Sequence, residues 1–211
     1  TRLLLPNHNA MAAKGTTLIM SDEDKSKELY NLCDQLFGFE ASFDDIRRWL
    51  DSNKNKEDLL IKAANYKYEG NFTPLHSLLR NEPPLDLVER LLQLAPDTIK
   101  EQDNNGKLPL HTALTYNAAD DVIKKLLQAY PKAAQVLDNE RGLLPLHYAL
   151  YNKASSDVFT MIFQAYPLAV KVQVNDGRFP LHLALENRAS SDVITMLFKA
   201  YPKAIDVKNK E

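Results

Sequence analysis

The segment Thr73-Pro74-Leu75-His76 occurs four times along the chain in closely similar form. The other copies are Leu108-Pro109-Leu110-His111, Leu144-Pro145-Leu146-His147 and Phe179-Pro180-Leu181-His182. Their histidines are 35, then 36, then 35 residues apart. A period of this length is typical of a solenoid, in which each unit buries its apolar face only against its neighbours. The spacing therefore predicts a stack of similar units.

Each motif is followed by a pattern that predicts two antiparallel helices. Proline suits the first turn of a helix, so the first helix should begin at the motif's proline and run about eight residues, as in 145–152. Ten residues after the histidine stands an aspartate, which suits the start of a second helix with two apolar pairs on one face. Serines beside it can cap that helix, and a proline ends it. The aspartates are Asp86, Asp121, Asp157 and Asp192, and the prolines are Pro96, Pro131, Pro167 and Pro202.

A polar turn with a glycine precedes three of the motifs, as in Asp103-Asn104-Asn105-Gly106. Asn-Gly and Asp-Gly favour tight turns with positive φ. With this turn, the sequence resembles the ankyrin repeat family, whose consensus has an Asp-x-x-Gly turn, Thr-Pro-Leu-His and two helices. The period is two or three residues longer than the family's usual 33. Ala-Tyr-Pro-x-Ala also replaces the usual Gly-Ala-Asp ending, as in the divergent arrays of many microalgal proteins.

The resemblance implies an all-α fold, an ankyrin-repeat solenoid of stacked helix-turn-helix units with projecting turns. We expect the array over residues 61–211, truncated or capped at its C-terminal end. If no further unit follows, Leu197, Phe198 and Ile205 should be partly uncovered. Residues 21–60 show two helical patterns that start at serines, and we interpret them as an N-terminal helical cap. Residues 1–20 show no periodicity and are interpreted as a flexible or partner-ordered extension.

Composition narrows the class of protein. The 211 residues are 45% hydrophobic and 26% charged, with a net charge of −2, which is typical of a soluble globular protein and gives no basic stripe for nucleic acid. Apolar runs are far shorter than the roughly 20 residues that span a bilayer, so we expect no membrane insertion. The single cysteine, Cys33, fits the cytoplasm or another reducing intracellular compartment. Because the chain begins with Thr1, organelle targeting by a removed segment stays open.

Nothing in the sequence points to catalysis, a cofactor or a metal. The chain has no phosphate-loop, dinucleotide or nucleophile-elbow motif. Zinc ligands must converge within about 2 Å of one ion, whereas stacked helices lie about 8–10 Å apart, so the repeated histidines cannot share an ion. The resemblance implies instead that they bond the backbone around the turns and tie neighbouring units together. We therefore predict that the protein is not an enzyme.

The resemblance implies a protein–protein interaction module or adaptor, which binds a partner protein through its concave face and turn tips. The alternative is a permanent structural subunit of a larger multiprotein assembly. Tyr and Arg dominate interface hot spots, so Tyr116, Tyr151, Arg141 and Arg178 are the best anchors. The predicted protein-binding residues are Arg80, Asn81, Asn104, Asn105, Lys107, Thr115, Tyr116, Glu140, Arg141, Leu143, Tyr151, Asn152, Asp176, Arg178, Glu186 and Asn187.

Overall fold

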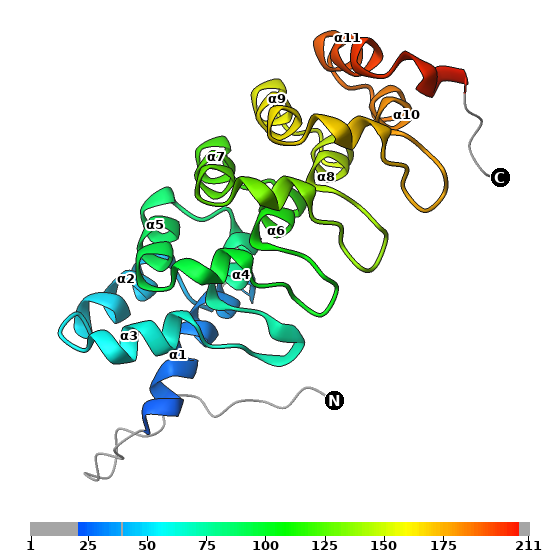
Figure 1. Ribbon diagram of the computed structural model, residues 1–211. Helices are drawn as coiled ribbons and strands as arrows, with labels where there is room; N and C mark the ends of the chain where they lie inside the picture. Colours follow the sequence, from blue (N-terminus) through cyan, green and yellow to red (C-terminus); the bar gives the residue numbers. More distant parts are fainter. Residues whose placement is uncertain (1–20, 39, 207–211) are drawn as a thin grey trace.

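The computed structural model describes residues 21–38 and 40–206, and within these ranges every regular element is a helix (Figure 1). The extension predicted at residues 1–20 lies outside the described part. None of the helices in the described part has both the length and the apolar character needed to cross a bilayer. The described chain is a single stack of helical units (Figure 1).

The first unit contains three helices, α1 (Asp22–Gln35), α2 (Phe43–Ser52) and α3 (Glu57–Ala64). The first two begin as predicted, because Ser21 and Ser42 each accept a hydrogen bond from the backbone three residues on, and an aspartate returns the bond. Helix α3 was not predicted, since it begins without a side-chain cap. The boundary expected at residue 60 falls inside α3, so this unit ends at Ala64.

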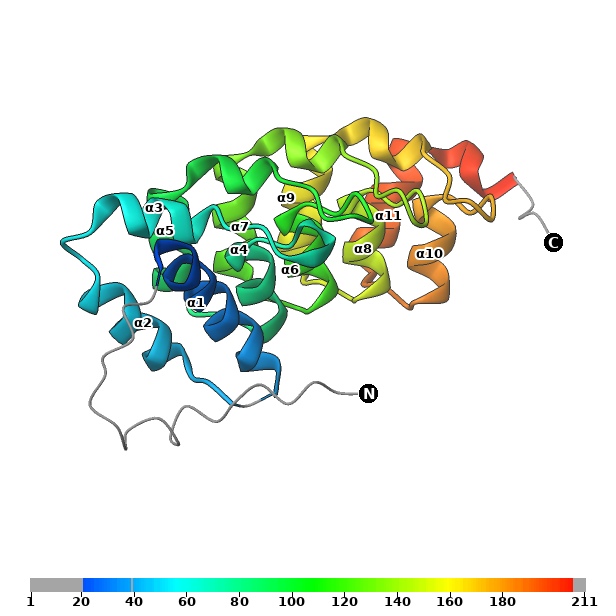
Figure 2. The same ribbon diagram turned by 90° about the horizontal axis from the view of Figure 1, so that it is seen from below.

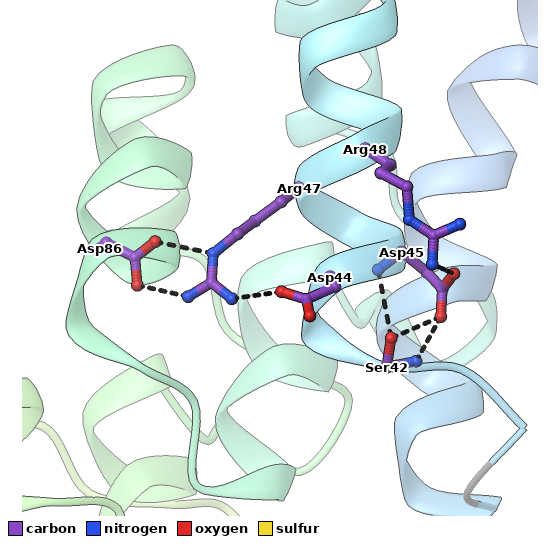
Figure 3. Close-up of polar contacts among 6 residues, drawn as sticks. All are labelled: Ser42, Asp44, Asp45, Arg47, Arg48 and Asp86. Carbon is purple, nitrogen blue, oxygen red and sulfur yellow. Dashed lines mark hydrogen bonds and ion pairs between the residues drawn. The ribbon is translucent and has the colours of Figure 1, made fainter.

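An arginine fork ties the first unit to the array (Figure 3). Arg47 of α2 donates through Nε and Nη2 to the two carboxylate oxygens of Asp86, at 3.0 and 2.9 Å, and through Nη1 to Asp44 at 2.9 Å. Asp86 stands at the start of α5, so the bidentate pair joins neighbouring units. Arg48 pairs with Asp45 of its own helix.

Four further units follow, each built from a first and a second helix. The first helices begin at the motif prolines, as predicted. Proline has no backbone N–H, but an N–H in the first turn of a helix has no partner within the helix, so nothing is lost there. They lie side by side, and α1 extends their row (Figure 2). The first helices are α4 (Pro74–Leu78), α6 (Pro109–Thr115), α8 (Pro145–Tyr151) and α10 (Pro180–Glu186), and the second helices are α5 (Leu85–Leu94), α7 (Asp120–Ala129), α9 (Ser156–Ala165) and α11 (Ser191–Ala200).

Short 3₁₀ helices complete the units. A five-residue 3₁₀ helix begins at each closing proline, where the sequence predicted only the end of the second helix. In the last two units, Ser155 and Ser190 cap the second helices as predicted. The 3₁₀ helices are η2 (Leu36–Gly38), η3 (Glu69–Asn71), η4 (Leu79–Asn81), η5 (Pro96–Lys100), η6 (Pro131–Gln135), η7 (Pro167–Lys171) and η8 (Pro202–Asp206).

Every first helix is followed by a left-handed residue, six positions after the motif histidine. In the third motif unit this residue is Lys153, with φ of 54°, and the next N–H, that of Ala154, donates to Ala149 O at 2.9 Å. The helix therefore ends at a residue in the left-handed conformation, which is usually a glycine at this position. The residues in this position are Glu82, Asn117, Lys153 and Arg188.

The core runs through the stack, and its end is uncovered at the last described unit. Three residues after the motif histidine, Leu150 is 3% exposed, whereas the matching Leu185 is 48% exposed. Phe198 and Ile205 are exposed as expected. The expectation for Leu197 was wrong, because this side chain is 1% exposed and belongs to the core.

Candidate partner-binding surface

The motif histidines hold each turn to the next unit. The Leu144 N–H donates to His147 Nδ1 at 2.9 Å, so Nδ1 is an acceptor and Nε2 carries the ring proton. His147 Nε2 then donates to Val172 O, in the next unit, at 3.2 Å. His111 bonds Leu108 N and Val136 O in the same way. This confirms the predicted role of the histidines in joining units.

Burial keeps these imidazoles neutral. It lowers the pKa of His111 and of His147 to about 4, because the charged ring would lose its hydration. The pKa of His76 is lowered for the same reason. Burial also raises the pKa of the Cys33 thiol, which lies in the core. Among the described residues, no group of His, Cys, Asp and Glu side chains is arranged to hold a metal ion.

An aspartate organises each of the two central turns. Asp103 Oδ1 accepts from the N–H groups of Asn105 and Lys107, at 2.8 and 2.9 Å. In the next turn, Asp138 accepts from the N–H groups of Arg141 and Leu143, at 2.6 and 3.3 Å. The backbone pair that closes the turn spans four residues in the first case and five in the second. The extra residue explains why His111 and His147 are 36 residues apart.

The turns are bonded to one another along the edge of the stack. The Asn104 N–H donates to Gly70 O at 2.8 Å, and the Asn139 N–H donates to Asn105 O at 2.7 Å. Lys107 Nζ also pairs with Glu140 at 3.1 Å. All turns project to the same side of the stack (Figure 1). We call the turn tips and the exposed ends of the first helices the turn surface, residues 65–82, 101–117, 136–152 and 172–187.

The structure brings five of the predicted binding residues together. The Arg141 guanidinium lies over the Tyr151 ring, 5.2 Å from its centroid, and that of Arg178 lies 5.9 Å from it. Arg178 Nη2 also donates to the Tyr151 hydroxyl at 3.0 Å. Asp176, and after it Glu186, bonds Arg178 and raises the pKa of this guanidinium. The turn and the end of the first helix therefore form one polar cluster.

Two smaller clusters lie along the same surface. The Arg80 guanidinium lies over the Tyr116 ring at 5.7 Å and pairs with Asp34 of α1. Lys107 Nζ lies 5.9 Å from the Tyr148 ring centroid. Tyr148 is buried, and its hydroxyl donates to Asp138 at 2.9 Å, so it supports the turn from below.

Not every predicted binding residue is available to a partner. Leu143 is only 1% exposed and belongs to the core, so its assignment to the surface was wrong. Its place in the longer third turn directs it inward, where the other apolar residues pack. The side-chain amides of Asn81 and Asn187 donate to backbone carbonyls of their own units, and the Thr115 hydroxyl donates to His111 O. Asn104, Asn105 and Glu140 are exposed, and Asn152 is half-buried.

The sequence analysis missed the ion pairs that link neighbouring units. Lys67 pairs with Glu101 at 2.6 Å, and Lys125 pairs with Glu89 at 2.7 Å. The partners are 34 and 36 residues apart. A signal was available, because residues one period apart occupy equivalent positions in adjacent units of a solenoid.

Comparison with known proteins agrees with this geometry. Residues 75–168 match the family model for ankyrin repeats, in three copies. These residues are ankyrin repeats. Among solved structures, a chain in the complex of a predatory endopeptidase from Bdellovibrio bacteriovorus with an immunity protein is similar, with a TM-score of 0.64 and 20% identity over 87% of this chain and 86% of that chain. No curated protein matches the chain.

The match fixes the fold and the general class of function. The solved structure shares the overall fold of this chain, and at 20% identity the likeness extends to the fold alone. The α10–α11 unit lies beyond the matched residues but repeats the same first helix, second helix and 3₁₀ helix. Ankyrin repeats are protein-interaction modules and typically have no enzymatic activity.

Proposed function

We propose that this chain binds a partner protein through the turn surface, as an interaction module or adaptor without catalysis. The observation that carries the proposal is the rigid edge of the stack. Backbone hydrogen bonds join the turns near Gly70, Asn105 and Asn139, while Asn104, Asn105 and Tyr116 leave their side chains exposed. A preordered surface loses less conformational entropy when a partner binds.

The partner in this proposal is a protein and not a nucleic acid. The net charge is −2, and most cations of the turn surface are already paired with carboxylates. Phosphate backbones are bound mainly by clustered cations that are free to replace counterions. A reducing intracellular compartment fits the buried, single Cys33.

Binding to a partner is tested by affinity capture on the immobilised full chain. The test variant combines Tyr116→Ala with Asn105→Arg, because both side chains are exposed on the turn surface. Lys124→Glu, exposed on α7, is the control on the second helices. Tyr151 is avoided because it is partly buried against the core. We expect the test variant to lose the captured protein and the control to retain it.

Loss of capture by the control alone would place the partner on the second helices. The second candidate function, a permanent subunit of a larger assembly, is distinguished by purification. A permanent subunit purifies only with its complex, whereas an adaptor is recovered alone and monodisperse. The uncovered Leu185 and Ile205 are the observation that favours this alternative.

A further inference from the structure

One cation of the turn surface differs from the others. Among the lysines and arginines of the turn surface, all of them in the described part of the chain, Arg141 alone has no carboxylate within 4.0 Å. The other four cations of this surface are neutralised within the chain. Their pairs are Lys67 with Glu101, Arg80 with Asp34, Lys107 with Glu140, and Arg178 with Asp176 and Glu186.

Arg141 is nevertheless held in place. Its backbone N–H donates to the buried Asp138 at 2.6 Å, and its guanidinium lies over the Tyr151 ring. Tyr151 is itself fixed, because it packs against the core and its hydroxyl accepts a hydrogen bond from Arg178. An arginine held on an aromatic ring still offers its N–H fork to a planar acceptor. Because it is preordered, little side-chain entropy is lost when that acceptor arrives.

We infer that Arg141, held over Tyr151, receives an aspartate or glutamate carboxylate from the partner protein. The inference rests on the proposed function and names the group that the partner brings to the turn surface. The partner's carboxylate forms a bidentate hydrogen-bonded pair with the guanidinium. This contact supplies specificity, since a neutral side chain in the same place would leave the charge uncompensated.

The surroundings favour a carboxylate over a phosphate. Asp176 and Glu186 form ion pairs with Arg178, whose guanidinium lies near the same Tyr151 ring as that of Arg141. A further carboxylate, that of Glu140, belongs to the residue before Arg141. Arg141 has no carboxylate within ion-pair distance, although Asp176 is near enough to feel its charge, so one added carboxylate can take the open fork. A phosphate group, with a charge of about −1.5 to −2, would be repelled by these neighbouring carboxylates more strongly than a partner carboxylate with a charge of −1.

The test is a coupling measurement with peptides selected on the immobilised full chain from a random displayed library. The tightest peptide is synthesised, and each of its acidic residues is changed in turn to the matching amide. One such change should weaken binding to the wild type at least about tenfold, and binding to Arg141→Gln by no more than about twofold. Arg90→Gln, a matched change of an exposed arginine on α5, should behave like the wild type.

The outcomes separate the inference from the proposed function. If no amide change weakens binding, or if the loss persists in Arg141→Gln, the carboxylate inference is overturned. Tighter binding of a phosphoserine version of the peptide also overturns it. The proposed function survives these results as long as Tyr116→Ala with Asn105→Arg abolishes binding. Peptides that bind this variant as well as the wild type, or a selection without binders, overturn both.

Discussion

The motif histidines couple the stability of the array to pH. Burial places the pKa of His111 and of His147 at about 4 in the folded chain, below the unfolded value of about 6.5. Between these values the unfolded chain binds more protons than the folded one, so stability is full above pH about 6.5 and declines as pH falls to about 4. Each pKa unit corresponds to about 1.4 kcal/mol, so the two histidines account for several kcal/mol.

Urea unfolding at a series of pH values measures this dependence. His147→Gln should flatten the slope between pH about 6.5 and about 4, since one titrating group is removed. The depressed pKa of Asp138 acts only at lower pH, because a carboxylate contribution is lost as pH falls through its folded pKa. Equal stability at both ends of the interval would contradict the assignment of neutral, buried histidines.

Gly106 is required by its turn for two reasons. Its φ is +73°, a region that residues with a side chain rarely adopt, and a Cβ atom there would lie 2.9 Å from the backbone nitrogen of Asn139. Gly106→Ala should therefore strain this turn and disturb the hydrogen bond from Asn139 to Asn105. We expect a loss of about 1–3 kcal/mol in the free energy of unfolding, measured by chemical denaturation.

The matched control for Gly106 is Gly38→Ala. A Cβ at Gly38 would meet only the Glu40 side chain at an ordinary distance of 3.7 Å. Its effect should stay within about 0.5 kcal/mol. Equal losses for the two variants would show that the turn accommodates a side chain.

A substitution at the end of a first helix should stabilise the chain instead of destabilising it. Lys153 is exposed and left-handed at the end of α8, where an L-residue costs about 1–2 kcal/mol relative to a right-handed one. Glycine relieves this strain but loses more backbone entropy on folding, by about 0.5–1 kcal/mol. Lys153→Gly should therefore raise the free energy of unfolding by up to about 1.5 kcal/mol.

Thermal unfolding compares this variant with Lys124→Gly. Lys124 is exposed within α7, where glycine should cost about 1 kcal/mol. If both variants melt earlier than the wild type, the left-handed residue is not a source of strain.

Helices with a strong local signal were the ones that the sequence predicted correctly. Ser21 and Ser42 cap the N-terminal ends of α1 and α2, and the motif prolines mark the first residues of the first helices. Helix α3 lacks such a signal, and the 3₁₀ helices depend on how the closing prolines meet the next unit. The local sequence pattern therefore predicted the first and second helices of each unit. It did not predict the 3₁₀ helices, which depend on contacts between units.

The binding surface was harder to predict than the fold. Leu143 looked exposed because its turn matched the others by composition, but one extra residue turns it into the core. Arg178 looked like a free anchor, yet its charge is bound by Asp176 and Glu186. The direction and partners of a side chain depend on three-dimensional neighbours that a single sequence does not record. The assignment of these residues to binding stays a prediction.

The stack as a whole should gain stability from one more unit. A copy of residues 177–206 attached after Glu211 keeps the 35-residue spacing of the motif histidines. It should cover Leu185, Phe198 and Ile205, and each well-buried side chain of this kind contributes about 1.5–3 kcal/mol. We expect the midpoint of thermal unfolding to rise by several degrees.

The control extension has the same length but carries serine in place of the copied Leu181, Leu183 and Val193. These positions are buried in the existing unit, so their loss should prevent the added helices from packing. A rise of similar size with both extensions would mean that chain length, and not coverage of the apolar face, stabilises the molecule.

The bonds that cross from unit to unit also set how the molecule responds to force. His111 and His147 each attach their unit to the next through one carbonyl, so a pull along the stack loads these links in series. The α10–α11 unit, with a described neighbour on one side only, should detach first and the others should follow one by one. Each detachment releases about 35 residues, or roughly 120 Å of extended chain. The length of the molecule under force should therefore increase in steps of nearly equal size.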